Sequence, residues 1–126
     1  MQISDWKCLR LDGLYIGQNL EEALSDSSWS HYKDGYLRST SFGDHSIGDD
    51  YSLASHRNGR IKMIQGKCLT EKSIKILEVG ESWDRATAYL GPNGLLIDQE
   101  TGERLCAIPI GPRIGHIVID SAESGS

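Results

Sequence analysis

The segment Leu14-Tyr-Ile-Gly-Gln-Asn-Leu-Glu-Glu-Ala23 is similar to a second one, Leu77-Glu-Val-Gly-Glu-Ser-Trp-Asp-Arg-Ala86, and the pair decides the expected fold. A shift of 63 residues, from position 14 to position 77, superposes the two. In each segment a strand pattern ends at a glycine, Gly17 or Gly80, and a helical pattern begins shortly afterwards. The order strand, glycine, helix therefore occurs twice in the chain.

Both helices are expected to begin at a capping residue. Asn19 and Ser82 occupy the matching N-cap position, where either side chain can accept a hydrogen bond from an amide of the first turn. Glu22, three residues after Asn19, is expected to complete a capping box. One buried stripe on each helix is predicted by apolar residues at helical spacing: Leu20, Ala23 and Leu24 in the first, and Trp83, Ala86 and Leu90 in the second.

Glycine and proline mark the other boundaries. Gly91 and Pro92 are expected to end the second helix after Leu90. Asn58-Gly59 is the strongest hairpin signal, because both positions of such a turn require a positive φ. Pro109 and Pro112 predict an edge position or a break between the last two strands. The expected strands are residues 36–42, 51–55, 60–65, 74–79, 95–97, 104–110 and 115–120.

These patterns predict an α+β fold in which two short helices pack on one face of a predominantly antiparallel sheet. The length of 126 residues indicates a single domain, residues 1–126. An internal tandem repeat is expected, with copies at about residues 7–66 and 67–120 and a mobile tail at 121–126. The alternative is a chance similarity between two β-α-β segments.

The charge balance limits the class of partner. Thirteen Lys and Arg residues against eighteen Asp and Glu residues leave a formal net charge of −5. Nucleic acid is not expected as a partner, because neutralising its phosphates requires a basic surface. A basic protein would instead be attracted over a long range. The acidic excess is concentrated in one loop, whose Asp44, Asp49 and Asp50 we expect to contact the partner.

The expected compartment is the cytoplasm. The first residues lack the basic and apolar regions of a secretory signal, and no apolar run approaches about 18 residues, so neither export nor a membrane is expected. Cys8, Cys68 and Cys106 are widely spaced and odd in number, which indicates reduced thiols rather than a disulfide framework.

Motifs of catalysis are missing from the sequence, which contains no G-x-S-x-G, no phosphate loop and no G-x-G-x-x-G. No catalytic residue, metal or cofactor is therefore expected. His45, in the acidic loop, would suit a metal or acid–base site, but the loop lacks calcium-loop spacing and is more typical of a solvated segment. Cys106 and His116 lie on neighbouring expected strands and would form a nucleophile pair only with suitable geometry.

Aromatic side chains on a polar segment are the other candidates for contact with a partner. Trp29, Tyr32 and Tyr36 lie in a stretch rich in Ser and Asp that has no helical or strand periodicity. Aromatic residues in such positions are enriched as interface anchors. The alternative is that two aromatics of this stretch fold back onto the core.

The unit from Val79 to Pro92 combines a strand ending in glycine, a capped helix with an apolar stripe, and a Leu-Gly-Pro stop. With the following hairpin it resembles the unit of the tandem-repeat β-lactamase inhibitor proteins and of the small outer-membrane-assembly lipoproteins. The first copy differs, since no Gly-Pro follows Leu24. This resemblance implies a protein-binding role. Small acidic α+β chains without catalytic motifs also resemble bacterial immunity proteins, which neutralise a cognate toxin, often a basic nuclease.

The expected function is that of a non-enzymatic inhibitor, most concretely an immunity protein that occludes the active site of a cognate antibacterial toxin. One alternative is a small ligand-binding or enzymatic domain with a His/Asp pocket near His45, His56 or His116. Another is an assembly module like the envelope lipoproteins. That module would require a lipidated cysteine near the N-terminus, and Cys8 follows no apolar region.

Overall fold

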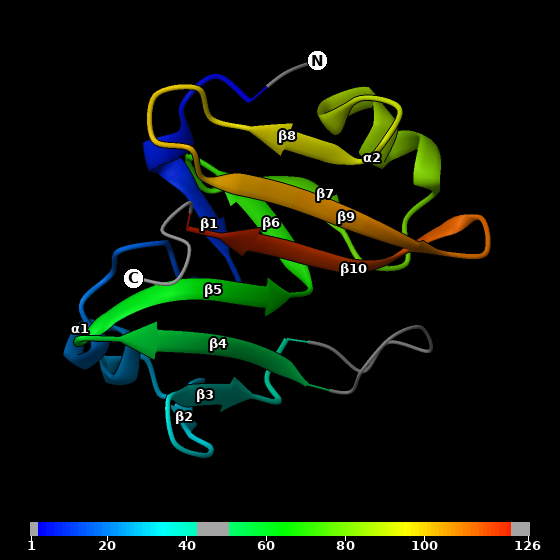
Figure 1. Cartoon of the computed structure of the whole chain (residues 1–126). Coiled ribbons are helices and arrows are strands. Elements are labelled where there is room, and N and C mark those ends of the chain that lie inside the picture. The colour runs from blue at the N-terminus through cyan, green and yellow to red at the C-terminus, as the bar shows by residue number, and fades with distance from the viewer. Residues whose placement is uncertain (1–2, 43–50, 122–126) are drawn as a thin grey trace.

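Two antiparallel sheets dominate the structure, a computed structural model that describes residues 3–42 and 51–121. The larger sheet has the strand order β2-β3-β4-β5-β10-β9-β8, and the smaller has the order β1-β6-β7 and lies behind β9 and β10 in Figure 1. The predicted α+β class is confirmed. The strands are β1 (Leu9–Leu11), β2 (Ser30–His31), β3 (Tyr36–Ser39), β4 (Ser52–Arg57), β5 (Arg60–Gly66), β6 (Cys68–Glu71), β7 (Ile74–Glu78), β8 (Leu95–Ile97), β9 (Arg104–Ile110) and β10 (Arg113–Asp120).

The register of the seven-stranded sheet shows which of its faces is covered. One row of cross-strand partners is fully buried, and it consists of Leu37, Ala54, Ile64, Ile119 and Leu105. The adjacent row remains in part accessible, and it consists of Arg38, Leu53, Gln65, Val118 and Cys106. Because successive side chains point to opposite faces, the first row lines the core and the second lines an open face.

The three-stranded sheet is the main departure from the predicted architecture, which had a single sheet. Leu11 of β1 is the cross-strand partner of Leu69 in β6, and both side chains are buried. The strand β6 was not expected from the sequence, because four residues are too few to show an alternating pattern. It pairs with β1 near the N-terminus, and a pairing between segments far apart in the chain leaves no local signal in the sequence.

Both predicted helices and their N-caps are confirmed. Helix α1 covers Leu20–Ser25 and α2 covers Trp83–Leu90, and a short 3-10 helix, η1, covers Trp6–Cys8. Asn19 accepts a hydrogen bond from the second helical N–H at 2.8 Å, and Ser82 does so at 3.3 Å. Helix α2 ends as predicted at a glycine with φ of 91°, whose N–H bonds back into the last turn at 2.9 Å.

The helices contribute to the core from the covered side of the large sheet. Ala23 of α1 and Ala86 of α2 are both fully buried, in agreement with the predicted stripes. Among the described residues, the Glu22 carboxylate accepts a hydrogen bond from the Tyr15 hydroxyl at 3.1 Å, so the predicted capping box with Asn19 is wrong. The glutamate is drawn towards the preceding loop instead of the start of its own helix.

Each helix start is bonded to a hairpin, and the two sets of bonds correspond. At the first junction Gly17–Leu20 runs beside Gly59–Ile61, and at the second junction Gly80–Trp83 runs beside Pro112–Ile114. The Gly17 N–H donates to the Ile61 carbonyl at 2.7 Å, and the Gly80 N–H donates to the Ile114 carbonyl at 2.8 Å. The Leu20 N–H donates to the Gly59 carbonyl and the Trp83 N–H donates to the Pro112 carbonyl, both at 2.9 Å. The internal repeat stays a prediction, with which these paired bonds agree.

A buried carboxylate, that of Asp12, lies between the two sheets. It accepts hydrogen bonds from the Ser52 hydroxyl and from the N–H groups of Lys67 and Cys68, the latter two at 2.9 and 2.8 Å. The Asp12 carbonyl accepts a further bond from Trp29 Nε1 at 3.0 Å. Burial raises the pKa of Asp12, and the three hydrogen bonds to its carboxylate act in the opposite direction. This cluster connects β1, β4 and β6.

The predicted Asn58-Gly59 turn is confirmed, and most of the expected long strands are found close to their predicted bounds. Asn58 and Gly59 adopt φ of 55° and 76°, as the predicted turn requires. Strands β8 and β9 have the predicted bounds, whereas β10 begins at Arg113, two residues early, and β3 ends at Ser39. Of the predicted tail, Ser121 is described and donates its N–H to the Lys62 carbonyl at 2.8 Å, and residues 122–126 lie outside the described part.

Candidate partner-binding surface

Trp29 is a core residue, and its prediction as an exposed anchor is wrong. Its side chain is only 2% exposed and its ring packs against Phe42, with ring centroids 6.2 Å apart. The indole N–H, which would be costly to bury unpaired, donates to Asp12. The polar residues around Trp29 concealed this role, because they face solvent while the indole turns inward.

Tyr32 and Tyr36 do reach the surface, near the β2 edge of the large sheet. Tyr32 is 44% exposed and Tyr36 is half-buried. The guanidinium of Arg38 lies 4.5 Å from the centroid of the Tyr32 ring, and Lys33 Nζ lies 5.2 Å from that of Tyr36. These cation–π contacts hold the two rings in place without covering them. The acidic candidates Asp44, Asp49 and Asp50, together with His45, lie outside the described residues.

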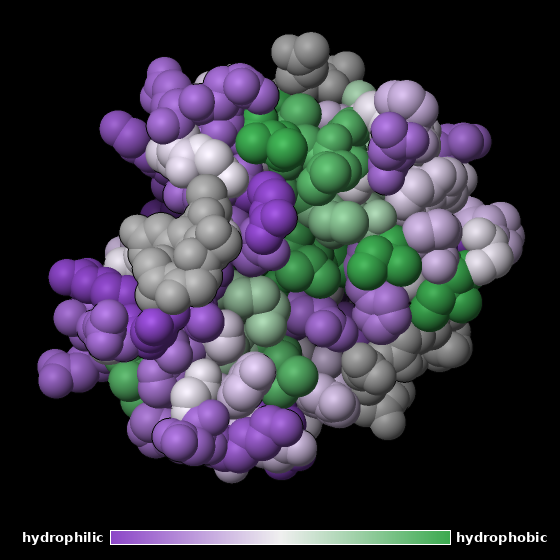
Figure 2. All heavy atoms as spheres, viewed as in Figure 1, coloured by the Kyte–Doolittle hydropathy of each residue, from purple (hydrophilic) through white to green (hydrophobic). Residues whose placement is uncertain are grey.

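Four apolar side chains emerge on the open face at the other end of the sheet. We call this set the apolar patch: Leu95 and Ile97 of β8, and Ile108 and Ile110 of β9, each between 43% and 44% exposed. Figure 2 shows hydrophobic side chains gathered over β8, β9 and β10, bordered by hydrophilic ones. An exposed apolar group of this kind marks an interaction site more often than isolated exposed residues do.

An acidic hollow of about 750 Å³ lies between η1 and the turn from β8 to β9, on the covered side of the sheet, where buried Ile119 also lines it. Asp98, the first residue after β8, follows directly on Ile97 of the patch. Burial, followed by the nearby charge of Asp98, raises the pKa of Glu103. The charged residues of the lining are four carboxylates and one amine: Asp5, Asp98, Glu100, Glu103 and Lys7. The aromatic rings of Trp6 and Tyr15 complete the walls.

None of the three thiols is activated for nucleophilic attack. A hydrogen bond to Asp5 raises the pKa of Cys8, and burial raises the pKa of both Cys68 and Cys106. A thiol with a raised pKa carries little of the reactive thiolate at neutral pH. The Cys106 thiol points to the Ala107 carbonyl at 3.7 Å rather than to a base.

Of the three histidines that the structure describes, two lie against each other and the third lies against Gln65. His116 Nδ1 lies 3.4 Å from Gln65 Nε2 on the open face, and the His31 and His56 rings meet edge to face with centroids 6.4 Å apart. Within residues 3–42 and 51–121, no group of three His, Cys, Asp or Glu side chains is placed to hold a metal ion. In the same ranges no helix is long and apolar enough to cross a bilayer.

The sequence missed both the apolar patch and the acidic hollow. A signal for the patch was present, since β9 carries apolar residues at both alternations: Leu105 and Ala107 face the core, and Ile108 and Ile110 face outwards. The hollow had no sequence signal, because Asp5 and Glu100 come together only in the fold. Comparison of the chain with known protein families, with curated proteins and with solved structures finds no match.

Proposed function

We propose that this chain is a non-enzymatic inhibitor of a basic protein, most concretely a cytoplasmic immunity protein that neutralises a cognate antibacterial toxin. The observation that carries the proposal is the acidic hollow at the turn from β8 to β9, whose Asp98 follows directly on Ile97 of the apolar patch. The partner is a protein with an apolar surface and one or more Lys or Arg side chains at its rim. Occlusion of the partner's active site by this surface is the mode of inhibition.

Apolar and acidic side chains have separate tasks in such a complex. The apolar patch supplies area that leaves water on binding, about 25 cal/mol per Å². The carboxylates accelerate encounter with a basic partner and set its orientation. Because Asp98 of the hollow follows directly on Ile97 of the patch, a partner that reaches around this end of the sheet can engage both groups. The formal net charge of −5 adds long-range attraction to the same partner.

Tyr32 and Tyr36 extend the proposed surface towards β2. Tyrosine is enriched among the residues that dominate binding energy, because it combines a large rigid ring with a polar tip. Both rings already lie against cations, so little conformational freedom is lost when a partner covers them. Asp44, Asp49 and Asp50 remain proposed contacts on the strength of their charge alone.

The two halves of the chain, at about residues 7–66 and 67–120, are proposed to be copies of one unit. Their corresponding junctions support this, because the same donors bond the same acceptors at nearly equal distances. Arg60 and Arg113 also correspond: each donates to the carbonyl of its junction glycine, at 3.3 and 2.9 Å. A chance likeness of two segments would not require the side chains to match as well.

The test uses the product of the reading frame next to this chain's gene, which the immunity hypothesis requires to be toxic. Calorimetry should find a one-to-one complex, and stopped-flow mixing should find an association rate that falls as salt rises. The variant Asp98→Asn/Glu100→Gln should slow association about tenfold at low salt. Ile108→Ser should chiefly speed dissociation, because it removes apolar contact area.

A matched control has the same change of net charge away from the hollow. Glu21→Gln/Asp84→Asn neutralises two exposed carboxylates in the first turns of α1 and α2. It should change association about twofold at most. A neighbouring product that is neither toxic nor bound would overturn the immunity role. An equal loss in the control and in the hollow variant would overturn the assignment of the surface.

A further inference from the structure

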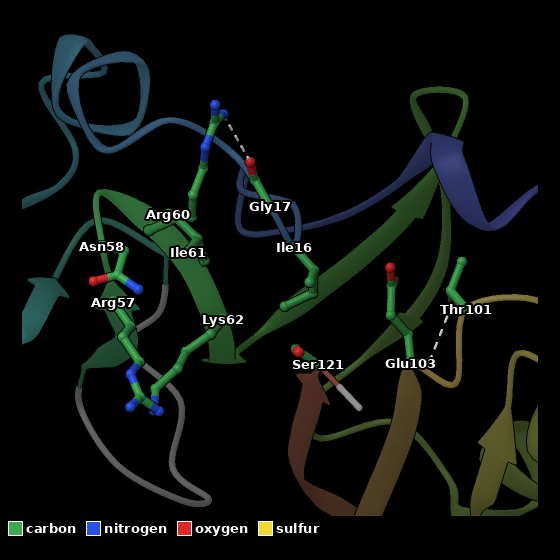
Figure 3. A pocket seen from close by; sticks show the side chains of 10 residues that line it. All are labelled: Ile16, Gly17, Arg57, Asn58, Arg60, Ile61, Lys62, Thr101, Glu103 and Ser121. Atoms are coloured by element: carbon green, nitrogen blue, oxygen red, sulfur yellow. Dashed lines mark hydrogen bonds between the residues drawn. The ribbon is translucent and has the colours of Figure 1, made fainter. Parts of the chain in front are cut away.

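A second hollow, of about 470 Å³, lies between the β4–β5 hairpin and the turn from β8 to β9. Unlike the acidic hollow, it is bordered by three cations, Arg57, Arg60 and Lys62, and by one carboxylate, Glu103. Its lining therefore has a net charge of +2, on a chain whose formal charge is −5. We call it the cationic hollow. Figure 3 shows the three cations on one wall and Glu103 on the opposite wall.

Two of these cations, Arg57 and Lys62, lie on the same side of the hairpin (Figure 3). Arg57 and Arg60 are direct cross-strand partners, but their side chains run apart, and Arg60 donates to the Gly17 carbonyl at 3.3 Å. Within residues 3–42 and 51–121, no carboxylate lies within ion-pair distance of either arginine, or of Lys62.

A β-bulge sets the direction of Lys62. In the β4–β5 pairing, Ser55 opposes Met63 and His56 opposes Ile61, so Lys62 is the extra residue of the bulge. Bulges redirect side chains and occur often beside functional sites. The floor of the hollow is apolar, since buried Ile61 and half-buried Ile16 line it. A charged wall above an apolar floor suits an organic anion better than an inorganic one.

We propose that the cationic hollow binds a small organic phosphate monoester. Its two negative charges match the net charge of the lining, and the guanidinium of Arg57 can donate two parallel hydrogen bonds to phosphate oxygens. Lys62 supplies a compact charge from the same side, and the organic part lies on Ile16 and Ile61. The volume is within the usual range for small-ligand sites. This site adjoins the proposed partner surface, since Glu103 lines both hollows, but its cations belong to the cationic hollow alone.

The test is calorimetric titration of the full chain with adenosine 5′-monophosphate, adenosine and inorganic phosphate at low salt. Saturable binding of the monophosphate is expected, with adenosine not binding and phosphate binding more weakly. Arg57→Gln and Lys62→Gln should each weaken binding about tenfold, because each removes a charged donor. Glu103→Gln should strengthen it severalfold, because it removes a carboxylate that faces the anion.

Lys72→Gln is the matched control, since Lys72 is exposed and lies outside the hollow. It should leave the affinity unchanged. Unchanged thermal unfolding of the Arg57 and Lys62 variants would show that binding, not folding, is affected. The proposal is overturned if the monophosphate does not bind up to about 10 mM, if the control weakens binding equally, or if inorganic phosphate binds as tightly. Each of these outcomes leaves the partner proposal intact, because Asp98 and Glu100 are unaltered.

Discussion

The two junctions share their backbone bonds and differ in what surrounds them. At the first, the hairpin of β4 and β5 carries the cations Arg57 and Lys62, which have no carboxylate partner among the described residues. At the second, the hairpin of β9 and β10 carries exposed Ile108 and Ile110. Backbone bonds constrain only the residues that make them, so side chains that point elsewhere are free to differ. One scaffold can thus present a charged surface in one half and an apolar surface in the other.

The interior also differs between the halves. Asp12 of the first half centres a hydrogen-bonded cluster that includes Lys67 and Cys68 at the start of the second, whereas position 75, which lies 63 residues further, carries Lys75 at the surface. Lys75 pairs with Glu78 at 3.0 Å and takes no part in a buried network. Both β1 and β7 pack apolar side chains into the core, Leu9 and Leu11 in the one and Ile76 and Leu77 in the other, so the buried polar bonds of Asp12 are the difference between them.

The largest expected effect comes from removing Asp12, which has no acidic counterpart at position 75. Asp12→Ala should lower the free energy of unfolding by about 3 kcal/mol, because two buried N–H groups and the Ser52 hydroxyl lose their acceptor. Urea unfolding followed by tryptophan fluorescence measures this. Asp34→Ala, at an exposed position, should cost about 0.5 kcal/mol or less. A loss at Asp12 as small as that of the control would show that the cluster is dispensable.

The two junction glycines, Gly17 and Gly80, should lose similar amounts of stability when each is replaced by alanine. Gly17 and Gly80 have φ of 87° and 96°, and no atom would contact an added Cβ at either one. Gly17→Ala and Gly80→Ala should therefore each cost about 1–2 kcal/mol through backbone strain alone. Urea unfolding of the two variants side by side is the measurement. Costs that differ by more than about 1 kcal/mol would contradict the correspondence of the halves.

The helix caps should differ slightly in strength. The bond accepted by Asn19 is 2.8 Å long, and that accepted by Ser82 is 3.3 Å long. Asn19→Ala should cost about 1 kcal/mol of unfolding free energy, and Ser82→Ala should cost less. Asn19→Ser, which keeps an acceptor, serves as the control and should recover most of the loss. A greater loss at Ser82 would reverse the expected order of the caps.

The smallest expected effect is a pH dependence of the unfolding stability that comes from Asp12. Burial raises the pKa of Asp12 above its unfolded value, so the folded state keeps this proton to a higher pH. Wild type should therefore be most stable relative to Asp12→Asn below about pH 4, and this advantage should shrink as pH rises through the raised pKa. Chemical unfolding of both proteins across that range is the measurement. An advantage that grows with pH would mean that the hydrogen bonds to the carboxylate outweigh its burial.

Several features followed from the sequence because their causes lie within a few residues. Asn19 and Ser82 cap helices through bonds to the second residue after them, and Gly91 ends α2 through its own φ. Asn58 and Gly59 form their turn through the positive φ that each adopts. The α+β class followed from these local signals taken in order along the chain, because each one marks the end of a helix or a turn between strands.

The candidate site was only partly accessible to sequence reasoning. Tyr32 and Tyr36 reach the surface as expected, whereas Trp29 is buried because its indole finds an acceptor at Asp12. Nothing in the order of residues distinguishes these aromatics, since all three lie among Ser and Asp. The exposed Ile108 was equally indistinct from the buried Ile117, because both belong to apolar strands.

By itself, the sequence determined where both helices start, where α2 ends and where the β4–β5 hairpin turns, and that the chain is acidic. Only the tertiary structure decided that β1 joins β6, that one face of the large sheet stays open, and that Asp5 and Asp98 border one hollow. The physical reason is the range of the interactions involved. Caps and turns are completed by neighbours along the chain, whereas pairing and burial depend on segments that meet only once every layer is in place.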